Sequence, residues 1–145
     1  MTLRLSTGLR DAQANGQFNA GAGANFDSGV LEFRVGTQPA SADDAPTGTL
    51  LVSMTLPADA FGASSAGVVA KAGTWEDTSA DAAGDAGWFR LKTSTDGGGS
   101  STTDRRIDGA ITATGGGGQI ELNNITIAAT QQVTQNTFAV THPAS

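Results

Sequence analysis

Apolar and polar residues alternate with a period of two along much of this chain, the pattern of β-strands that bury one face. Strand patterns of this kind lie at 30–35, 49–56, 68–71, 87–93, 106–113, 119–128 and 138–140. In the first segment Leu31 and Phe33 share one face, whereas Glu32 lies on the other. Because glycine and proline interrupt every longer window, we expect seven or eight short strands with turns between them.

The faces defined by this alternation predict the hydrophobic core. Its expected members are Leu31, Phe33, Val35, Val52, Met54, Phe89, Leu91, Ile107, Ile111 and Phe138. Towards the end of the chain the apolar phase shifts between Leu122 and Ile125. A shift of one residue turns every following side chain to the opposite face, so we expect a bulge or tight bend at Asn123 and Asn124.

The N-terminal region has a different pattern. Leu5, Leu9 and Ala12 fall at i, i+4 and i+7, and Ser6 is a suitable N-cap, so we expect a short helix over 3–12. Glycines in 13–28 predict a loop there. We therefore expect an N-terminal arm, 1–28, followed by a β-domain, 29–145. The fold class is all-β, an antiparallel β-sandwich or jelly roll with a short N-terminal helix or arm.

Composition narrows the classes of partner. The chain has 145 residues and a net charge of -6. It has no cysteine, which excludes disulfides and thiolate metal sites. Its only basic pair, Arg105 and Arg106, is flanked by Asp104 and Asp108, so we expect no direct nucleic-acid binding. No apolar run is long enough to span a membrane, and the first residues lack a signal-peptide pattern, so we expect a protein that is made and used, or assembled, in a reducing cytoplasm.

Few residues offer chemistry. Asp77, Asp81 and Asp85 follow a four-residue spacing, but Gly84 favours a solvated loop over a weak cation site. The single histidine, His142, lies three residues from the end, where we expect an exposed tail. We predict no catalytic residue, no cofactor and no metal, and hence no enzyme.

The glutamates and tryptophans bear on whether the protein acts on or binds a carbohydrate. Glu32 and Glu121 lie opposite the apolar strand faces, so we expect both to face solvent, unlike the paired carboxylates of a glycosidase. Trp75 and Trp88 are expected as core or interface anchors, with stacking on a sugar ring as the alternative. The run 115–118 is glycine-rich but lacks the ending of a phosphate-binding loop.

Several strand and turn motifs resemble a family of small virion structural proteins of tailed bacteriophages. The resemblance is carried by Gly29–Leu51, Phe61–Val68 and Ala86–Leu91, with Leu3–Arg10 and Arg106–Ile111 adding to it. It covers most of residues 2–113 and is weak beyond them. One departure follows Arg10, where leucines are expected and the chain has Ala12 and Ala14 instead.

This resemblance implies a capsid decoration (cement) protein on the capsid exterior, which binds and stabilises the lattice of the phage major capsid protein. Self-association as a dimer or trimer is also expected. The alternatives are a tail-tip, baseplate or fibre-associated protein, or a carbohydrate-binding module. The candidate interface residues are Phe18 and Phe26 in the arm, and Glu76, Asp77, Asp81 and Asp85 in the loop 76–87.

Overall fold

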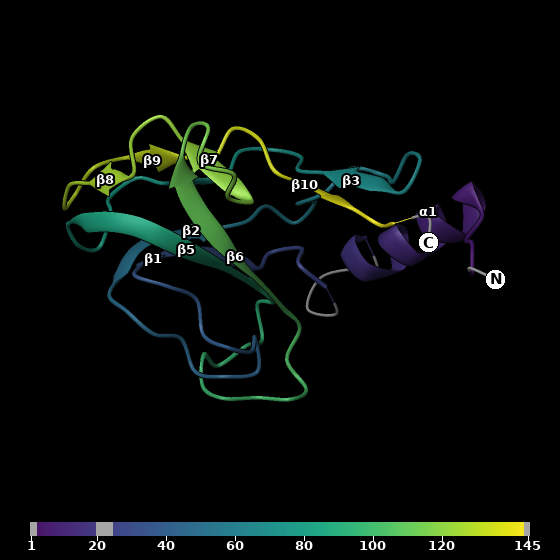
Figure 1. Cartoon of the computed structure of the whole chain (residues 1–145), viewed down its shortest axis with the longest axis horizontal. Coiled ribbons are helices and arrows are strands. Elements are labelled where there is room, and N and C mark those ends of the chain that lie inside the picture. The colour runs from purple at the N-terminus through teal and green to yellow at the C-terminus, as the bar shows by residue number, and fades with distance from the viewer. Residues whose placement is uncertain (1–2, 20–24, 144–145) are drawn as a thin grey trace.

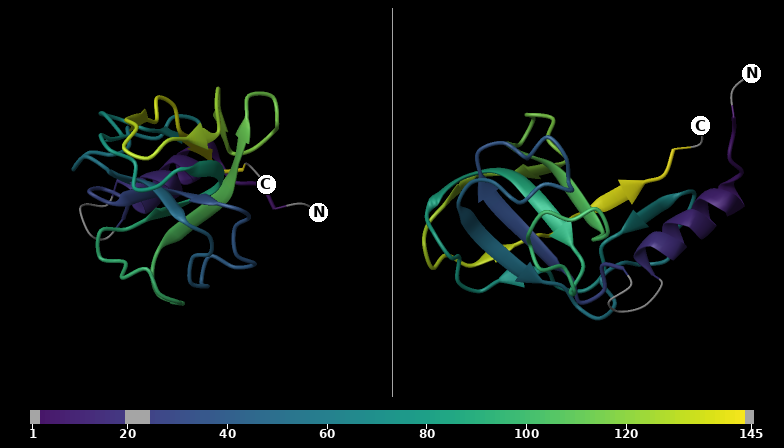
Figure 2. Two further views of the ribbon diagram at one scale, coloured as in Figure 1. Left: turned by 90° about the vertical axis from the view of Figure 1, so that its left-hand side faces the viewer. Right: turned by 90° about the horizontal axis from the view of Figure 1, so that it is seen from below.

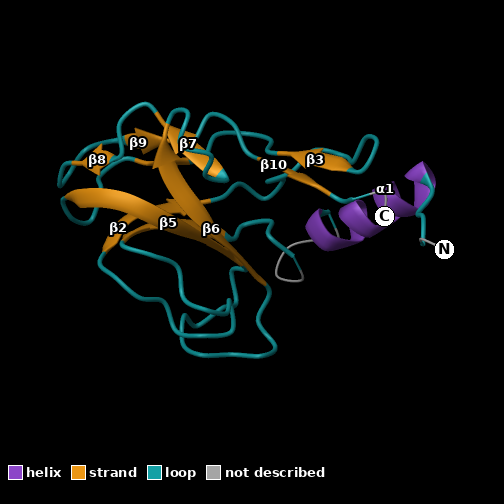
Figure 3. Cartoon of the chain, viewed as in Figure 1, coloured by secondary structure: helices purple, strands orange, loops and turns teal. Residues whose placement is uncertain are grey.

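The computed structural model describes residues 3–19 and 25–143, and this part of the chain is mostly β with one helix (Figures 1 and 3). The helix α1 spans Thr7–Phe18. The strands are β1 (Val30–Val35), β2 (Leu50–Thr55), β3 (Val68–Ala70), β4 (Glu76–Asp77), β5 (Gly84–Lys92), β6 (Arg106–Ala113), β7 (Ile120–Leu122), β8 (Thr126–Ile127), β9 (Val133–Thr134) and β10 (Ala139–Thr141).

The main sheet has the strand order β2-β1-β5-β6-β7, and β8 also pairs with β5. Its pairs are antiparallel except β6 with β7, which is parallel, so the purely antiparallel prediction is wrong at this edge. The glycine-rich connection after β6 makes the parallel return possible. Gly115 and Gly117 have φ of 88° and 81°, which bulkier residues rarely adopt. The sheets are mixed and do not close into a barrel.

Two smaller pairs, β3 with β10 and β4 with β9, lie beside the main sheet. The β8 and β9 strands are at one end of the molecule, whereas α1 and β3 project from the other (Figures 1 and 2). Helix α1 contacts β3 directly. The molecule therefore has a sheet body and a projecting helix end, which we define as residues 3–18 together with β3.

Burial confirms most of the predicted core. Eight of its ten expected members are buried, whereas Val35 and Ile107 are partly buried and pack against the others. The prediction that Glu32 faces solvent is wrong, because its exposed fraction is 5%. The loops 36–49 and 93–105 cover the face of the sheet opposite the core, so this face is buried too (Figure 1). Glu121 is exposed, as expected.

The helix is displaced from its expected position. Ser6 is the N-cap, as predicted, and its side chain accepts a hydrogen bond from the backbone N–H of Leu9. The helix nevertheless runs from Thr7 to Phe18, so both boundaries of the helix predicted over 3–12 are wrong, and so is the loop over 13–18. Tertiary packing offsets the helix-destabilising effect of Gly16, because Ala14 and Phe18 are buried in the core.

The sequence pattern predicts the longer strands correctly and misses the shortest ones. Each of the segments 30–35, 49–56, 68–71 and 106–113 contains one strand, and 119–128 contains two. β5 begins at Gly84, three residues before the segment predicted over 87–93, and β10 ends at Thr141, one residue beyond 138–140. The predicted break at Asn123 and Asn124 is confirmed, because β7 ends at Leu122 and β8 begins at Thr126. The two-residue strands β4 and β9 were not predicted, since their pairing joins segments far apart in the chain.

Candidate functional site

A row of aromatic rings joins the helix end to the centre of the main sheet. Phe18 of α1 packs on Phe61 with ring centroids 4.7 Å apart, and Phe61 meets Trp75 edge to face at 5.2 Å. Trp75 then contacts Phe138 at 5.5 Å, and Phe138 contacts Phe89 of β5 at 5.7 Å. We call these five rings the aromatic row; they fix the helix end to the body by apolar packing.

Phe18 and Phe26, proposed from the sequence as partner contacts, are inside the protein. Phe18 is fully buried, and Phe26 packs against it with ring centroids 5.4 Å apart. Their surroundings are the chain's own aromatic side chains, so neither ring presents a surface to a partner. The interface expectation is corrected for these two residues, and packing of α1 explains why they occur in this part of the chain.

Polar side chains of α1 form a second attachment, to residues 62–67. The Asp11 carboxylate accepts hydrogen bonds from the Gly67 backbone N–H and the Ser64 hydroxyl, each at 2.7 Å. These bonds to the ionised form lower the pKa of Asp11. Arg10 donates to the carbonyl oxygens of Ala66 and His142 at 2.8 and 3.0 Å. The helix is thus held both by polar contacts and by the aromatic row.

Among the described residues, the exposed large hydrophobic side chains all belong to the helix end. They are Leu3 with an exposed fraction of 80%, Leu9 with 47% and Val68 with 37%. The apolar face expected for the helix therefore exists, but it is not the face that packs on the body: Leu9 and Ala12 are exposed, whereas Ala14 and Phe18 are buried. These exposed side chains at the projecting end make it a candidate for a binding surface.

The acidic candidates lie at the opposite end, near β8 and β9. Glu76 and Asp77 form β4, and Asp85 belongs to β5, so the solvated loop expected over 76–87 is wrong at both of its ends. The Asp77 carboxylate accepts from the Ser53 backbone N–H at 2.9 Å, and Asp85 accepts from the Thr126 hydroxyl at 2.7 Å. Glu76, Asp81 and Asp85 remain exposed.

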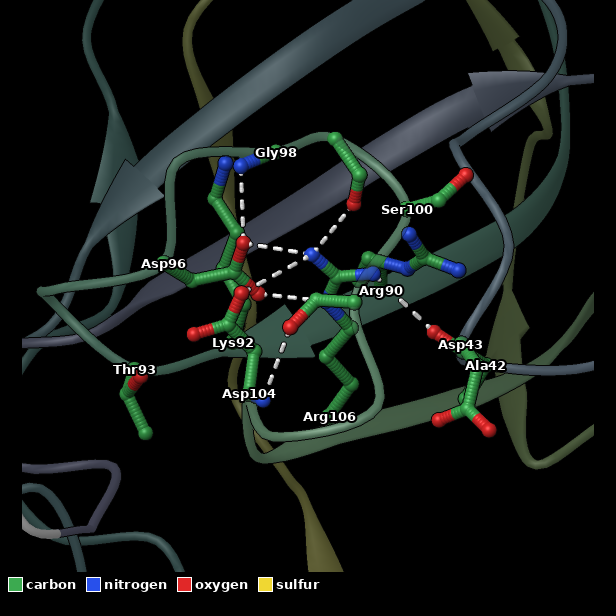
Figure 4. A network of polar contacts seen from close by, with 12 residues as sticks. Ala42, Asp43, Arg90, Lys92, Thr93, Asp96, Gly98, Ser100, Asp104 and Arg106 are labelled. Carbon is green, nitrogen blue, oxygen red and sulfur yellow. Dashed lines mark hydrogen bonds and ion pairs between the residues drawn. The ribbon is translucent and has the colours of Figure 1, made fainter.

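The largest polar cluster is buried under the main sheet, on the face opposite the core (Figure 4). Arg106 Nε lies 2.5 Å from Asp96 Oδ2, and the same guanidinium also donates to the carbonyl oxygen of Gly99. Burial alone would raise the pKa of Asp96, but hydrogen bonds from Arg106 and the Gly98 backbone N–H reverse this, so the pKa is lowered. The hydrogen bond to Asp96 raises the pKa of Arg106.

Arg90 holds a second buried pair beside the first. Its guanidinium donates to both carboxylate oxygens of Asp108 at 2.8 and 2.7 Å, and to the carbonyl oxygen of Asp44 at 2.9 Å. Glu32 is placed between Arg34 and Lys92 at 3.0 and 2.7 Å. These arginines bind backbone carbonyls of both covering loops, so the cluster has a structural use: it fastens the loops to the sheet.

His142 and the two tryptophans do not lie at the exposed positions that a tail residue or a sugar-stacking ring would need. His142 is not an exposed tail residue: its Nε2 lies 2.6 Å from Gln17 Oε1, and its ring meets Phe18 edge to face. Trp75 and Trp88 are both fully buried, Trp75 in the hydrophobic core and Trp88 under the loop 36–49, where its indole N–H donates to the Thr47 carbonyl oxygen. Neither indole can therefore stack on a sugar at the surface, which removes the observation that favoured a carbohydrate-binding module.

Within residues 3–19 and 25–143, no three His, Asp or Glu side chains gather where they could hold a metal ion. In the same residues no helix has the length and apolar character needed to cross a membrane. The chain matches no protein-family model, no curated protein and no solved structure. The exposed side chains of Leu3, Leu9 and Val68 make the helix end the candidate functional site.

Proposed function

We propose that this chain is a non-enzymatic structural protein of a tailed-phage virion, a capsid decoration protein that binds the lattice of the major capsid protein. The observation that carries the proposal is that the exposed large hydrophobic side chains of the described residues, Leu3, Leu9 and Val68, all belong to the helix end. The strand and turn motifs described above support the choice of protein class.

The internal contacts support a role in which the protein transmits force rather than reacts. The aromatic row ties the helix end to the sheet. The loop 36–49 is tied to the sheet by the hydrogen bond from Arg90 to the Asp44 carbonyl oxygen, and the loop 93–105 by the Arg106–Asp96 pair. A surface attached in this way keeps its shape under load. Many copies, each with a modest contact, would then stabilise a shell by the sum of their contacts.

The two ends of the molecule differ in chemistry, which suits contact with two neighbouring subunits. The helix end exposes the hydrophobic side chains of Leu3, Leu9 and Val68, whereas the β8–β9 end carries the exposed carboxylates of Glu76, Asp81 and Asp85 (Figure 1). An acidic surface favours a basic patch on the shell, and this contact depends on ionic strength. We also propose a β-sandwich architecture, in which the β3–β10 and β4–β9 pairs form the layer facing the main sheet.

The direct test is binding of the purified chain to empty shells assembled from the major capsid protein of the same phage. Leu9→Glu places a charge on the helix end, and Ala40→Glu adds the same charge at an exposed position in the covering loop 36–49. We expect Leu9→Glu to abolish co-sedimentation with shells and Ala40→Glu to retain it. Equal binding by both variants would remove the helix end from the proposal.

A count of copies in purified virions separates capsid from tail. Hundreds of copies in isolated heads agree with the proposal. A handful of copies confined to isolated tails would overturn the capsid assignment and favour the tail-tip or baseplate alternative. Deleting residues 2–28 is not a usable test, because it removes the buried side chains of Phe18 and Phe26 and with them part of the core.

A further inference from the structure

A polar cavity of about 240 Å³ lies between β7 and the segment 134–137, which connects β9 to β10 (Figure 1). Apart from Leu122, every side chain that lines it is polar: Glu121, Asn123, Thr134, Gln135, Asn136 and Thr137. We call it the amide cavity, because three of these side chains are primary amides. Its walls therefore offer hydrogen bonds, unlike the apolar core beneath the main sheet.

Gln135 is the buried member of this lining, with an exposed fraction of 5%. Its Nε2 donates to the Thr137 carbonyl oxygen at 2.6 Å, and Thr137 also lines the cavity, so the amide group lies in the cavity wall. The same bond fixes the orientation of the amide, because the flipped form would set two acceptors against each other. Oε1 is buried and has no hydrogen-bond partner among the described residues. Such an acceptor is costly, and a donor bound in the cavity would remove the cost.

Glu121 supplies a carboxylate that the glycine-rich turn before β7 holds in place. The backbone N–H groups of Gly115 and Gly117 donate to its two oxygens at 3.1 and 2.9 Å. These bonds lower the pKa of Glu121, so the carboxylate is ionised at neutral pH, and each oxygen keeps a further lone pair for a ligand. Asn123 Oδ1 accepts from the Thr114 hydroxyl at 3.2 Å, which leaves Nδ2 as the donating end of this side chain. The lining thus has fixed acceptors with a donor beside them.

The chemistry of this lining selects the class of ligand. It contains no lysine, arginine or histidine, and the sequence has no lysine or arginine after Arg106, so an anion would find no counter-charge. It has one carboxylate, and no three His, Asp or Glu side chains of the described residues gather to hold a metal ion. It has no aromatic ring on which a flat ligand could stack. The ligand that fits is neutral and carries several hydrogen-bond donors.

We propose that the amide cavity binds a sugar, whose hydroxyl groups donate to Gln135 Oε1 and to the Glu121 carboxylate. A sugar hydroxyl both donates and accepts, which matches a lining of carboxylate, amide and hydroxyl groups. The volume is below the roughly 300–1,000 Å³ of sites for drug-sized ligands, so the cavity suits a single sugar unit. A second cavity of about 400 Å³ shares Asn136 and Thr137 with it, so an oligosaccharide has room to continue.

This site differs from the one suggested by the tryptophans, since it uses hydrogen bonds and no stacked ring. Sugar hydroxyls exchange bonds with water for bonds with the protein, so we expect weak binding by each copy. The inference goes beyond the proposed function, because it needs no contact with a capsid. Many copies on one particle would raise the affinity for a surface that displays many sugars.

Nuclear magnetic resonance of the isotope-labelled full chain tests the inference. The probes are glucose, galactose, mannose and N-acetylglucosamine, each added in a titration, with calcium chloride and sodium sulfate as probes of the other ligand classes. We expect saturable shifts with at least one sugar, confined to the backbone amides of 121–123 and 134–137 and to the side-chain amide of Gln135. Calcium and sulfate should leave these signals unchanged.

Variants at exposed positions keep the fold intact. Thr134→Ala/Asn136→Ala removes two side chains of the lining and should weaken sugar binding about tenfold. Gln13→Ala/Thr129→Ala changes two exposed side chains outside the lining and should bind as wild type. Equal affinity of the two double variants overturns the inference. No saturable shift with any of the four sugars, or shifts at the cavity with calcium or sulfate alone, overturns it as well.

One variant separates this inference from the proposed function. Leu9→Glu, which should abolish binding to shells, lies outside the lining of the amide cavity and should bind the sugar as wild type does. Sugar binding without shell binding would leave this inference standing and overturn the capsid proposal. Shell binding without sugar binding would do the reverse.

Discussion

The guanidinium of Arg106 and the carboxylate of Asp96 face each other in a two-bonded pair, with both side chains buried and N···O distances of 2.5 and 2.7 Å. Arg106 lies on β6, whereas Asp96 lies in the loop 93–105 that covers the sheet. The pair therefore decides whether this loop stays on the sheet. Removing one partner of a buried pair leaves an uncompensated charge, which is more costly than the pair is worth.

We predict that Asp96→Asn lowers the free energy of unfolding at neutral pH by about 3–5 kcal/mol. Because the pKa of Asp96 is lowered in the fold, its contribution is complete above its ordinary value of 3.8 and is lost as the pH falls through the lowered value. The difference from wild type should therefore shrink in urea melts below that pH. Asp81→Asn, at an exposed carboxylate, is the control and should cause little change.

We predict a steric coupling between Gly109 and Phe89. Gly109→Ala places a Cβ 2.6 Å from the Phe89 ring and should cost about 1–3 kcal/mol. Phe89→Leu removes the colliding ring, so the double variant should be less destabilised than the sum of the single variants. Denaturant melts of the four proteins measure this. Gly97→Ala, where the added Cβ meets nothing within 4 Å, is the control. Strict additivity would contradict the packing described here.

A pair of helix variants tests which face of α1 is buried. Phe18→Ala should cost about 3–5 kcal/mol, because its ring is fully buried against Phe26 and Phe61. Leu9→Ala, on the exposed face, should change stability by about 0.5 kcal/mol or less. Comparable losses at both positions in thermal or denaturant unfolding would show that the apolar face expected from the sequence is the one that packs.

The acidic end makes a prediction about salt. If Glu76 and Asp81 meet a basic patch on the shell, binding of the wild-type chain should weaken as ionic strength rises, since the screening length is about 10 Å at 0.1 M salt. The Glu76→Gln/Asp81→Asn variant should bind more weakly at low salt and depend less on salt. Asp43→Asn, an exposed change in a covering loop, should behave as wild type. Sedimentation with shells over a salt series gives the comparison.

The local sequence pattern correctly predicts the elements that bury one face and whose defining interactions lie within a few residues along the chain. The alternation of Leu31 and Phe33 predicted β1 with its correct bounds, and the phase shift after Leu122 predicted the break before β8. The N-cap hydrogen bond of Ser6 was predictable from the sequence, because an N-cap acts within one helical turn. These features follow from steric and hydrogen-bonding rules that operate over a few residues.

Tertiary structure decided the features that depend on distant segments. The sequence placed Glu32 in solvent, but two loops fastened by Arg90 and Arg106 bury that face. The two-residue strands β4 and β9 exist only through each other.

The same division applies to the candidate site. From the sequence alone, Phe18 and Phe26 looked available to a partner, since aromatic residues in a glycine-rich arm have no visible packing. Only the fold showed that Phe61, far along the chain, covers them, and that Leu3, Leu9 and Val68 remain exposed instead. The sequence determines which side chains are hydrophobic. The tertiary contacts decide which of them are buried, because burial requires surfaces that only the folded chain brings together.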